Sequence, residues 1–571
     1  MPVAIVHVVG IVFGYWLLRR LFPATIALLA ALLWASDPFV VAFSRFLHVD
    51  GLMATFATLS FLLACYYWYH KTHLVALIAS GVCAGLAILS KSPALILVPT
   101  VFSVAYFSHA LQQQPSQYTL KYLLQQGRTT FPSVMLWGVV CGVTIVALWP
   151  ALWVEPLRVY ELFRAGVVVE GGEPHDLGNF FLGRADDAPG PLYYPMALIL
   201  RSTPITFFGV LLLPFVFHII PRPSRQHGYS LIGFIFLFVV AMSIFPKKFD
   251  RYLVPVFPMI DIMAAVGLVG GIQFAVRIMR VGWQSKWATG ALSIVGILAF
   301  ANALFWHPYG IAAFNQLLGG TATGARTFQV GWGEGYEQVA AWLNEQPDIT
   351  GVLTVSSMRS SLQPFLREGA QTAGPENMQL PDASGYVVVY LRQVQRGQLS
   401  APFNQFYQRA RPLHTVTIHG VEYAWIYQAP PDVAQSHYAD FGDNIRLLGY
   451  EQQDDLNDGI QDTSFDLTLF WEAQRPPSQD YMLFAHLIGP DGQRRAQVDL
   501  PYPKDIWQAR PYVEIPFSLQ LPTNLQSGNY QLVIGLYDQN NGERLPIKAE
   551  TAAAPELAGP HAFRLTNLRI E

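Results

Sequence analysis

Cysteine and charged residues are both scarce in this chain. Its 571 residues include three cysteines, all in apolar stretches and none in a Cys-x-x-Cys pair, so neither a disulfide framework nor a cysteine zinc site is expected. Only 13 % of the residues are charged, and no glycine-rich phosphate-binding loop is present. The part after His307 carries more Asp and Glu than Lys and Arg, which argues against a nucleic-acid partner.

Long apolar stretches, by contrast, fill the first 307 residues. Each of ten stretches is long enough to cross a bilayer core of about 30 Å. They are residues 3–19, 25–42, 51–70, 74–90, 92–108, 133–152, 193–218, 229–246, 252–276 and 287–306. We therefore predict a polytopic α-helical membrane protein, a multi-pass protein of the cell membrane.

The basic residues between these stretches predict the orientation. Alternate connections carry Lys or Arg and no acid, and the positive-inside rule places them in the cytoplasm. The connections that hold Asp50 and Lys91, the segment 155–191 and everything after His307 then lie on the outer side. The same rule places Met1 outside, so we expect that the beginning of the chain is missing.

One outer connection contains Asp50 with Arg45 and His48 close by. A carboxylate in this position suits a general base or a metal ligand. Aspartate is also common at the start of a helix, so the alternative is that Asp50 only caps a helix.

Cations on the outer side form a second group of candidate site residues. Lys91 lies between two stretches, and Lys247, Lys248 and Arg251 precede Tyr252 at the end of another. Because the positive-inside rule disfavours cations there, we expect them to hold the phosphate of an anionic lipid head group. The alternative for Lys91 is a lysine that snorkels at the membrane interface, and the alternative for the other cations is that they neutralise Asp250 and neighbouring acids.

A long outer loop supplies a third group. Glu173, His175, Asp176 and Asn179 lie in a glycine-containing loop that could meet a sugar. Their close spacing without helical periodicity is weak evidence for a metal site, and we assign no metal ligands. Asp261 lies inside an apolar stretch, where it is functional, neutral or paired with another helix.

The polar remainder divides into two regions. Residues 308–430 show a helical pattern followed by short apolar runs, which predicts a small α/β region outside the membrane. Residues 431–571 predict a β-sandwich, with strands at 466–471, 482–488, 514–521 and 530–537. Trp471, Tyr481, Trp507 and Tyr512 could stack on sugars in a carbohydrate-binding module, or they could belong to the core.

Several ordered segments of the chain resemble GT-C glycosyltransferases of the protein O-mannosyltransferase and aminoarabinose-transferase superfamily. The resemblance covers about residues 1–345. Its segments are Ser44–Asp50, Leu89–Pro93, Asn179–Gly183, Pro189–Pro195, Lys247–Leu253, His307–Gly320 and Gly331–Gly335.

The resemblance implies transfer of a sugar from a polyprenyl-phosphate donor to an acceptor on the outer side of the membrane. Asp50 and His175 would be catalytic, His175 from the loop that covers the substrate together with Glu173, Asp176 and Asn179. The donor phosphate would be held by Lys91, Lys247, Lys248, Arg251 and Tyr252. No nucleotide sugar is needed, a divalent metal is not demanded, and the acceptor could be a glycan, a lipid or a protein.

The chain also departs from this superfamily. The resemblance implies an additional first helix and a first outer loop that carries the main catalytic carboxylate, and neither is present. We therefore expect the chain as written to be inactive, or its start to lie upstream. Two other functions stay open, a transporter or flippase of lipid-linked glycans and a noncatalytic glycan-binding subunit anchored in the membrane.

Overall fold

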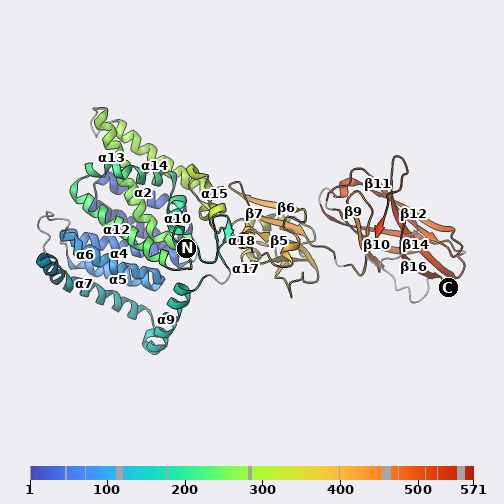
Figure 1. Ribbon diagram of the computed structural model, residues 1–571, viewed down its shortest axis with the longest axis horizontal. Helices are drawn as coiled ribbons and strands as arrows, with labels where there is room; N and C mark the ends of the chain where they lie inside the picture. Colours follow the sequence, from blue (N-terminus) through green and yellow to red (C-terminus); the bar gives the residue numbers. More distant parts are fainter. Residues whose placement is uncertain are drawn as a thin grey trace. The chain divides into compact units, whose positions relative to one another are not determined.

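The computed structural model describes residues 2–570 with short gaps. The gaps are residues 46–47, 71–72, 111–119, 175–177, 281–285, 398, 432, 453–463, 474, 508–509, 524 and 550–559. The chain divides into two compact units, a membrane unit (residues 1–331, 395–397 and 418–421) and a C-terminal unit made of the other residues (Figure 1). Each is described by itself below.

The membrane unit is built from helices. They are α1 (Pro2–Leu21), α2 (Ala24–Ser36), α3 (Pro38–Arg45), α4 (Val49–His70), α5 (Leu74–Ser90), η1 (Ser92–Ile96), α6 (Leu97–Ala110), α7 (Leu120–Leu148), α8 (Ala151–Val154), α9 (Pro156–Gly172), α10 (Tyr193–Arg201), α11 (Pro204–Val216), η3 (Phe217–Ile219), α12 (Arg222–Ile244), η4 (Asp250–Val256), α13 (Phe257–Ile278), α14 (Lys286–Trp306), η5 (Gly310–Ala312), η6 (Gln316–Leu318) and α15 (Gly320–Thr327). A two-stranded ribbon joins β1 (Phe180–Phe181) to β2 (Arg184–Ala185).

Within the described residues, six helices are long and apolar enough to cross a membrane, or eight if two bent pairs each count as one span. Two shorter apolar helical segments, 74–90 and 92–108, coincide with predicted stretches. Each of the ten predicted stretches thus lies on a helix or a helix pair. The predicted fold class, a polytopic helical membrane protein with a C-terminal β region, is confirmed.

Two of the predicted spans are broken, which their apolar composition does not reveal. α2 and α3 are bent by 56° at Asp37, and α10 and α11 by 113° before Pro204. Asp37 Oδ1 accepts the backbone N–H groups of Phe39 and Val40, and Thr203 Oγ1 accepts that of Thr206. Both side chains therefore start a new helix inside an apolar run.

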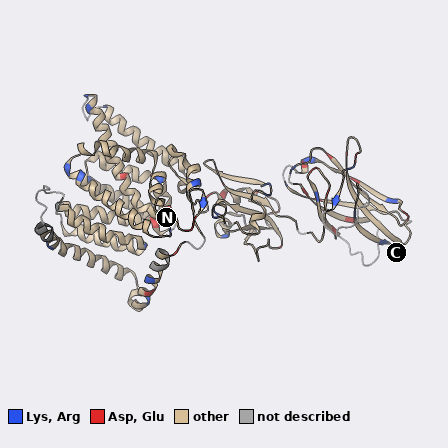
Figure 2. Ribbon diagram, viewed as in Figure 1, with Lys and Arg blue, Asp and Glu red and all other residues tan. Residues whose placement is uncertain are grey.

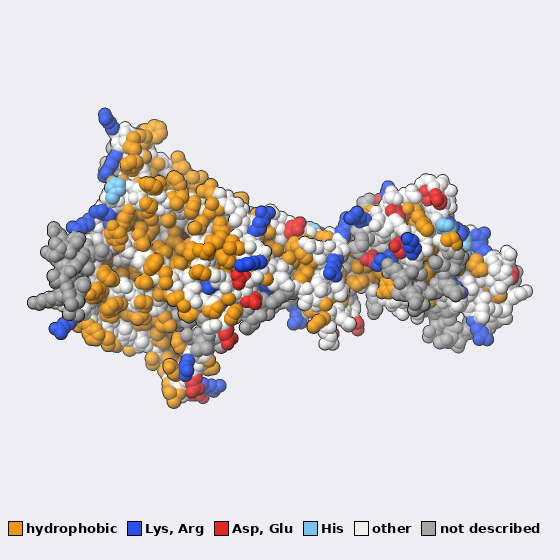
Figure 3. All heavy atoms as spheres, viewed as in Figure 1, with side chains coloured by type: hydrophobic (Ala, Val, Ile, Leu, Met, Phe, Trp, Pro, Cys, Tyr) orange, Lys and Arg blue, Asp and Glu red, His pale blue; other side chains and the backbone are white. Residues whose placement is uncertain are grey.

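α13 forms the centre of the membrane unit, and its apolar window is entirely buried. α11 crosses it at close range, because a Cβ atom added to Gly267 would lie 1.9 Å from the carbonyl oxygen of Gly209. In contrast, only 17 % of the α7 window and 11 % of the α14 window are buried. Figure 3 shows how much of the visible face of this unit is hydrophobic, as a lipid-facing surface requires.

The C-terminal unit begins with a small α/β region. Its helices are α16 (Tyr336–Asn344), α17 (Arg359–Leu362), η7 (Gln363–Phe365), α18 (Leu391–Gln395) and η8 (Phe403–Gln405). Its sheet has the order β4-β3-β5-β7-β6, with β3 parallel to β4 and β5. The strands are β3 (Leu353–Ser356), β4 (Gln371–Ala373), β5 (Ser384–Tyr390), β6 (His414–Ile418) and β7 (Val421–Gln428).

Two antiparallel sheets follow, with orders β13-β10-β9-β8-β15 and β12-β11-β14-β16. The strands are β8 (Gln435–Asp440), β9 (Ile445–Gln452), β10 (Ser464–Ala473), β11 (Tyr481–Ile488), β12 (Arg494–Tyr502), β13 (Tyr512–Gln520), β14 (Gly528–Asp538), β15 (Lys548–Ala549) and β16 (Phe563–Ile570), with η10 (Lys504–Trp507) between β12 and β13. Residues of both sheets form one core cluster that contains Trp471, Tyr481 and Trp507, each at most 3 % exposed. These three aromatic rings are therefore core residues and do not face a glycan.

A substitution at the α11–α13 crossing tests its tightness. Gly267→Ala places a methyl group against backbone atoms, so we expect a loss of more than about 1 kcal/mol of stability. Gly290→Ala on α14 is the matched control, because nothing lies within 4 Å of the added atom and alanine favours a helix. Thermal unfolding in detergent measures both, and equal melting temperatures for the two variants would contradict the close crossing.

Candidate active site

Asp50, the second residue of α4, is the centre of the candidate site. Its side chain is 1 % exposed, and Lys91 Nζ donates to Oδ1 over 2.6 Å. His48 Nδ1 lies 3.0 Å from Oδ2, and Arg251 Nε lies 4.0 Å from the same oxygen. Asp50 is therefore more than a helix cap, because it joins basic side chains from three separate segments of the chain.

Aromatic rings hold the cations beside Asp50. Lys91 Nζ lies 4.2 Å from the ring centroid of Tyr252. The Arg251 guanidinium lies 4.9 Å from the Phe249 centroid and 5.7 Å from that of Tyr252. Such cation–π contacts keep a charged side chain in place without neutralising it. Lys91, Arg251 and Tyr252, predicted to bind one phosphate, are thus neighbours of Asp50.

A buried ion pair fixes the segment that carries Arg251. Arg201, at the end of α10, donates to Asp250 Oδ2 from Nε over 2.8 Å and from Nη2 over 2.5 Å. Its Nη1 donates to the carbonyl oxygens of Ile311 and Ala313, each over 2.7 Å. Asp250 Oδ1 in turn accepts the backbone N–H of Arg251. The position of Arg251 therefore depends on Arg201.

The sequence analysis did not identify Arg201. It lies inside the stretch 193–218, and a charge within an apolar span was the available signal. Asp250 was considered only as an acid that neighbouring cations neutralise. Its partner is a more distant residue, Arg201.

Asn179 is hydrogen-bonded to the segment that carries Lys248 and Arg251. Its side chain is fully buried, its Nδ2 donates to the carbonyl oxygen of Lys248 over 2.5 Å, and its Oδ1 accepts the N–H of Phe180. Glu173 is exposed after the end of α9. His175 and Asp176 lie outside the described residues. The structure thus connects the loop after α9 to the cation segment through Asn179.

Lys247 and Lys248 point to different surroundings. Lys247 lines a cavity together with Lys91 and Tyr252. Lys248 is buried, and its Nζ donates to the carbonyl oxygen of Phe245 over 2.5 Å. Burial lowers the pKa of Lys248, because desolvation disfavours its charged form. The geometry thus brings Lys247 to the cavity and ties Lys248 to the backbone.

The cavity has a volume of about 530 Å³ and lies beside Asp50's partner Lys91. One end carries polar groups and the walls are hydrocarbon. Its lining residues are Lys91, Ser92, Pro93, Leu95, Ile96, Phe238, Ala241, Met242, Phe245, Lys247 and Tyr252. Charged residues are otherwise sparse along the helices of the membrane unit (Figure 2). An amphipathic ligand with an anionic head group fits this lining.

The membrane unit also contains an acid inside a helix. Asp261, inside α13, accepts a hydrogen bond at Oδ1 from Thr206 Oγ1 over 2.8 Å. Among the described residues, no group of three or more His, Cys, Asp or Glu side chains could hold a metal ion. We propose no metal ligands from them.

Residues 1–137 match the family model of dolichyl-phosphate-mannose-protein mannosyltransferases. This match lies within the part of the chain for which the sequence analysis describes a resemblance to GT-C glycosyltransferases. No curated protein matches the sequence significantly.

Three solved structures are similar to the chain at low sequence identity. ArnT from Cupriavidus metallidurans bound to undecaprenyl phosphate is 14 % identical with a TM-score of 0.37, over 74 % of this chain and 83 % of that one. The Archaeoglobus fulgidus oligosaccharyltransferase is 12 % identical with a TM-score of 0.31, over 100 % and 86 %. Arabinosyltransferase EmbB from Mycobacterium smegmatis is 12 % identical with a TM-score of 0.32, over 97 % and 58 %. We carry no site residue over from structures this distant.

The Arg201–Asp250 pair generates a stability prediction. Asp250→Asn leaves the buried guanidinium without its counter-charge, so we expect a loss of about 3–5 kcal/mol. The matched control is Glu155→Gln, which removes the exposed pair with Arg158 and should cost less than about 1 kcal/mol. Thermal unfolding of both variants in one detergent checks this, and a small effect of Asp250→Asn would show that the pair does not hold the segment.

Proposed function

We propose that this membrane protein is a glycosyltransferase that moves a sugar from a polyprenyl-phosphate donor to an acceptor hydroxyl on the outer side of the membrane. The observation that carries the proposal is the amphipathic cavity beside Asp50. Lys91 and Lys247 line its polar end, and Phe238, Met242 and Phe245 lie along its walls. A phosphate at the polar end and a prenyl chain along the walls match both parts of this lining.

The cations around Asp50 suit the chemistry of the leaving group. When the acceptor oxygen attacks the anomeric carbon, the bond between that carbon and the phosphate oxygen breaks and polyprenyl phosphate leaves with the electron pair. Lys91, Lys247 and Arg251 would stabilise the charge that develops on this phosphate. Tyr252 would act mainly by holding Lys91 and Arg251 through its ring.

Asp50 would receive the proton of the acceptor hydroxyl. Its carboxylate is ionised beside Lys91 and Arg251, and contacts with these cations weaken it as a base. A donor phosphate that shares the same cations would relieve this effect and leave a carboxylate oxygen for the acceptor. We therefore assign Asp50 the general-base role, in place of the carboxylate that the resemblance implies in a first outer loop, while His175, Glu173 and Asp176 stay predicted residues of the substrate loop.

The orientation is part of the proposal. The positive-inside rule places the connections at Arg19–Arg20, Arg222 and Lys286 in the cytoplasm, so the Asp50 end of the bundle and the C-terminal unit would face outward. A polyprenyl-phosphate donor is consistent with this side, because such a donor needs no cytoplasmic nucleotide sugar.

Binding of undecaprenyl phosphate to protein in lipid nanodiscs tests the donor site. We expect Lys91→Met and Lys247→Met each to weaken binding about tenfold or more, because each removes a charged hydrogen-bond donor. Lys286→Met at the start of α14 is the matched control and should bind like the original protein. Unchanged affinity in both cavity variants would refute the donor site.

Asp50→Asn tests the base separately. The amide cannot take up a proton, and it no longer repels the donor phosphate. We expect undecaprenyl phosphate to bind at least as tightly, and sugar transfer from dolichyl-phosphate mannose to fall at least a hundredfold. Transfer at the original rate would exclude Asp50 as the base, and loss of both binding and transfer would point to a structural role.

A further inference from the structure

A second cavity of about 500 Å³ lies between α10, α11, α12 and α13. Its lining residues are Pro195, Leu198, Ile199, Ser202, Phe207, Val210, Leu211, Leu213, Ile232, Ile235, Ile260 and Met263. The sequence analysis and the proposed donor site assign it no role. It is comparable in volume to the cavity beside Lys91.

The lining restricts the chemistry of an occupant. Ser202 is the only residue of this lining with a polar side chain, and its hydroxyl donates to the carbonyl oxygen of Leu198 over 2.6 Å. A polar occupant would lose its hydrogen bonds to water and find no partner on these walls. The occupant is therefore a hydrocarbon chain.

The cavity lies at the bend between α10 and α11. The two helices turn by 113°, and Thr203 and Pro204 start α11 in its new direction. α11 then packs directly on α13 at Gly209 and Gly267. The cavity is lined by residues of α10 and α11 on both sides of this bend, together with residues of α12 and α13.

The cavity opens toward the bilayer. Three of its lining side chains are largely exposed in the absence of lipid, Ile199 at 46 %, Leu211 at 51 % and Ile232 at 44 %. All three belong to helices or helix pairs that qualify as membrane spans. A lipid chain can therefore enter the cavity from the bilayer. Inside the cavity it would pack more closely against these side chains than lipid outside the cavity does.

The second cavity is separate from the donor cavity. The two share no lining residue, and α12 contributes to both from different positions. Ile232 and Ile235 face the second cavity, whereas Phe238, Met242 and Phe245 face the donor cavity. One prenyl chain along α12 would thus leave the second cavity available for another lipid.

One wall of the second cavity is α10, which also positions a segment of the candidate active site. α10 supplies three of its lining residues and ends at Arg201, which holds Asp250 next to Arg251. A chain anchored against α10 would therefore lie close to the segment that we propose to bind the donor. A transferase needs two substrates at one site, and the two cavities offer one apolar anchor for each.

We propose that the second cavity holds the hydrocarbon chain of a lipid-anchored acceptor. This inference rests on the proposed function and names the class of its acceptor: a hydroxyl or glycan attached to a lipid. The polar part of that acceptor would extend from the cavity toward Asp50, where its hydroxyl would meet the donor.

A photoreactive probe tests the cavity without requiring turnover. The probe is dodecyl glucoside with a diazirine in its alkyl chain, added to the full-length protein in nanodiscs. We expect labelling of α10, α11 or α12 residues of the second cavity that unlabelled dodecyl glucoside suppresses at least fivefold and excess undecaprenyl phosphate does not suppress. Labelling that does not saturate would mean bulk lipid only and would overturn the proposal.

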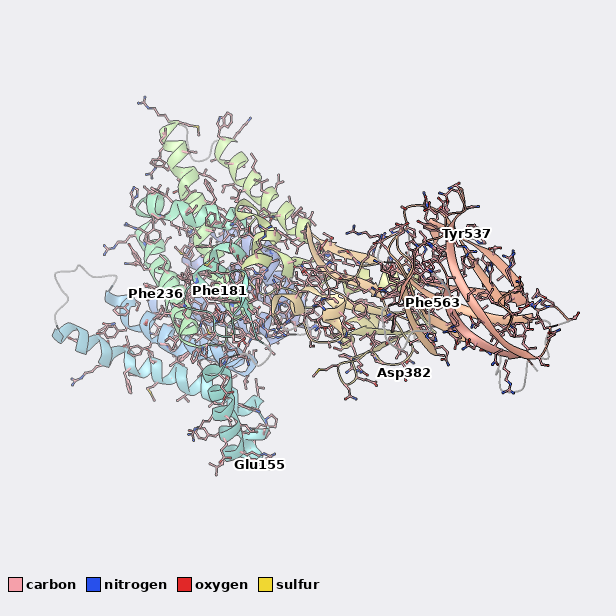
Figure 4. The ribbon with its side chains drawn as sticks, turned by 45° about the vertical axis from the view of Figure 1, so that its right-hand side comes forward. Glu155, Phe181, Phe236, Asp382, Tyr537 and Phe563 are labelled. Carbon is pink, nitrogen blue, oxygen red and sulfur yellow. The ribbon has the colours of Figure 1, made fainter. Side chains whose placement is uncertain are left out.

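Two variants that fill the cavity provide a second readout. Leu198→Trp and Val210→Trp should each lower the saturable labelling at least fivefold and leave the affinity for undecaprenyl phosphate within twofold. Phe236→Trp is the matched control, because Phe236 lies on α12 with 64 % exposure and lines neither cavity (Figure 4). Unchanged labelling in both filled variants would also overturn the proposal.

The outcomes separate this proposal from the proposed function. If undecaprenyl phosphate displaces the probe from α10 and α11, the second cavity belongs to the donor, and the acceptor assignment fails while the donor class stands. If undecaprenyl phosphate binding does not depend on Lys91 or Lys247 while the probe still labels the second cavity saturably, the proposed donor site fails on its own.

Discussion

The burial of one carboxylate, that of Asp50, is the constraint on which the rest of the membrane unit depends. A buried charge is costly unless cations and hydrogen bonds compensate it, and here the compensation comes from Lys91, Arg251 and His48 on three different segments. These segments must therefore meet at the start of α4. The Arg201–Asp250 pair and the Asn179 side chain hold the most distant of them, because both bind the stretch that leads into Arg251. The site is thus built by long-range contacts and not by one local motif.

The apolar side chains of the helices determine which ligands fit beside Asp50. Beside the polar centre, the helices leave two cavities with different linings, one with Lys91 and Lys247 at one end and one without a charged side chain. The first fits a lipid phosphate and the second fits only a chain. This difference gives the two substrates of a transfer reaction separate places along α12.

The sequence predicted the helices well and the contacts between them only in part. Apolar length alone located the helical segments, and the strands predicted at 466–471, 482–488, 514–521 and 530–537 lie within β10, β11, β13 and β14 apart from single end residues. The positive-inside rule singled out Lys91 and Arg251, because a cation on the disfavoured side needs a reason. The breaks at Asp37 and Thr203 were missed, since one capping residue hardly changes the hydrophobicity of a long stretch. The burial of Lys248 and the partner of Asp250 depend on tertiary packing, which no local pattern encodes.

A cryo-electron microscopy structure of the protein with undecaprenyl phosphate in nanodiscs tests the central claim most directly. We expect density for the phosphate within hydrogen-bond distance of the Lys91 and Lys247 ammonium groups, and a prenyl chain along Phe238, Met242 and Phe245. The Asp50 carboxylate should remain beside Lys91 and Arg251. A phosphate bound elsewhere, or a cavity that stays filled by bulk lipid at saturating undecaprenyl phosphate, would contradict the account.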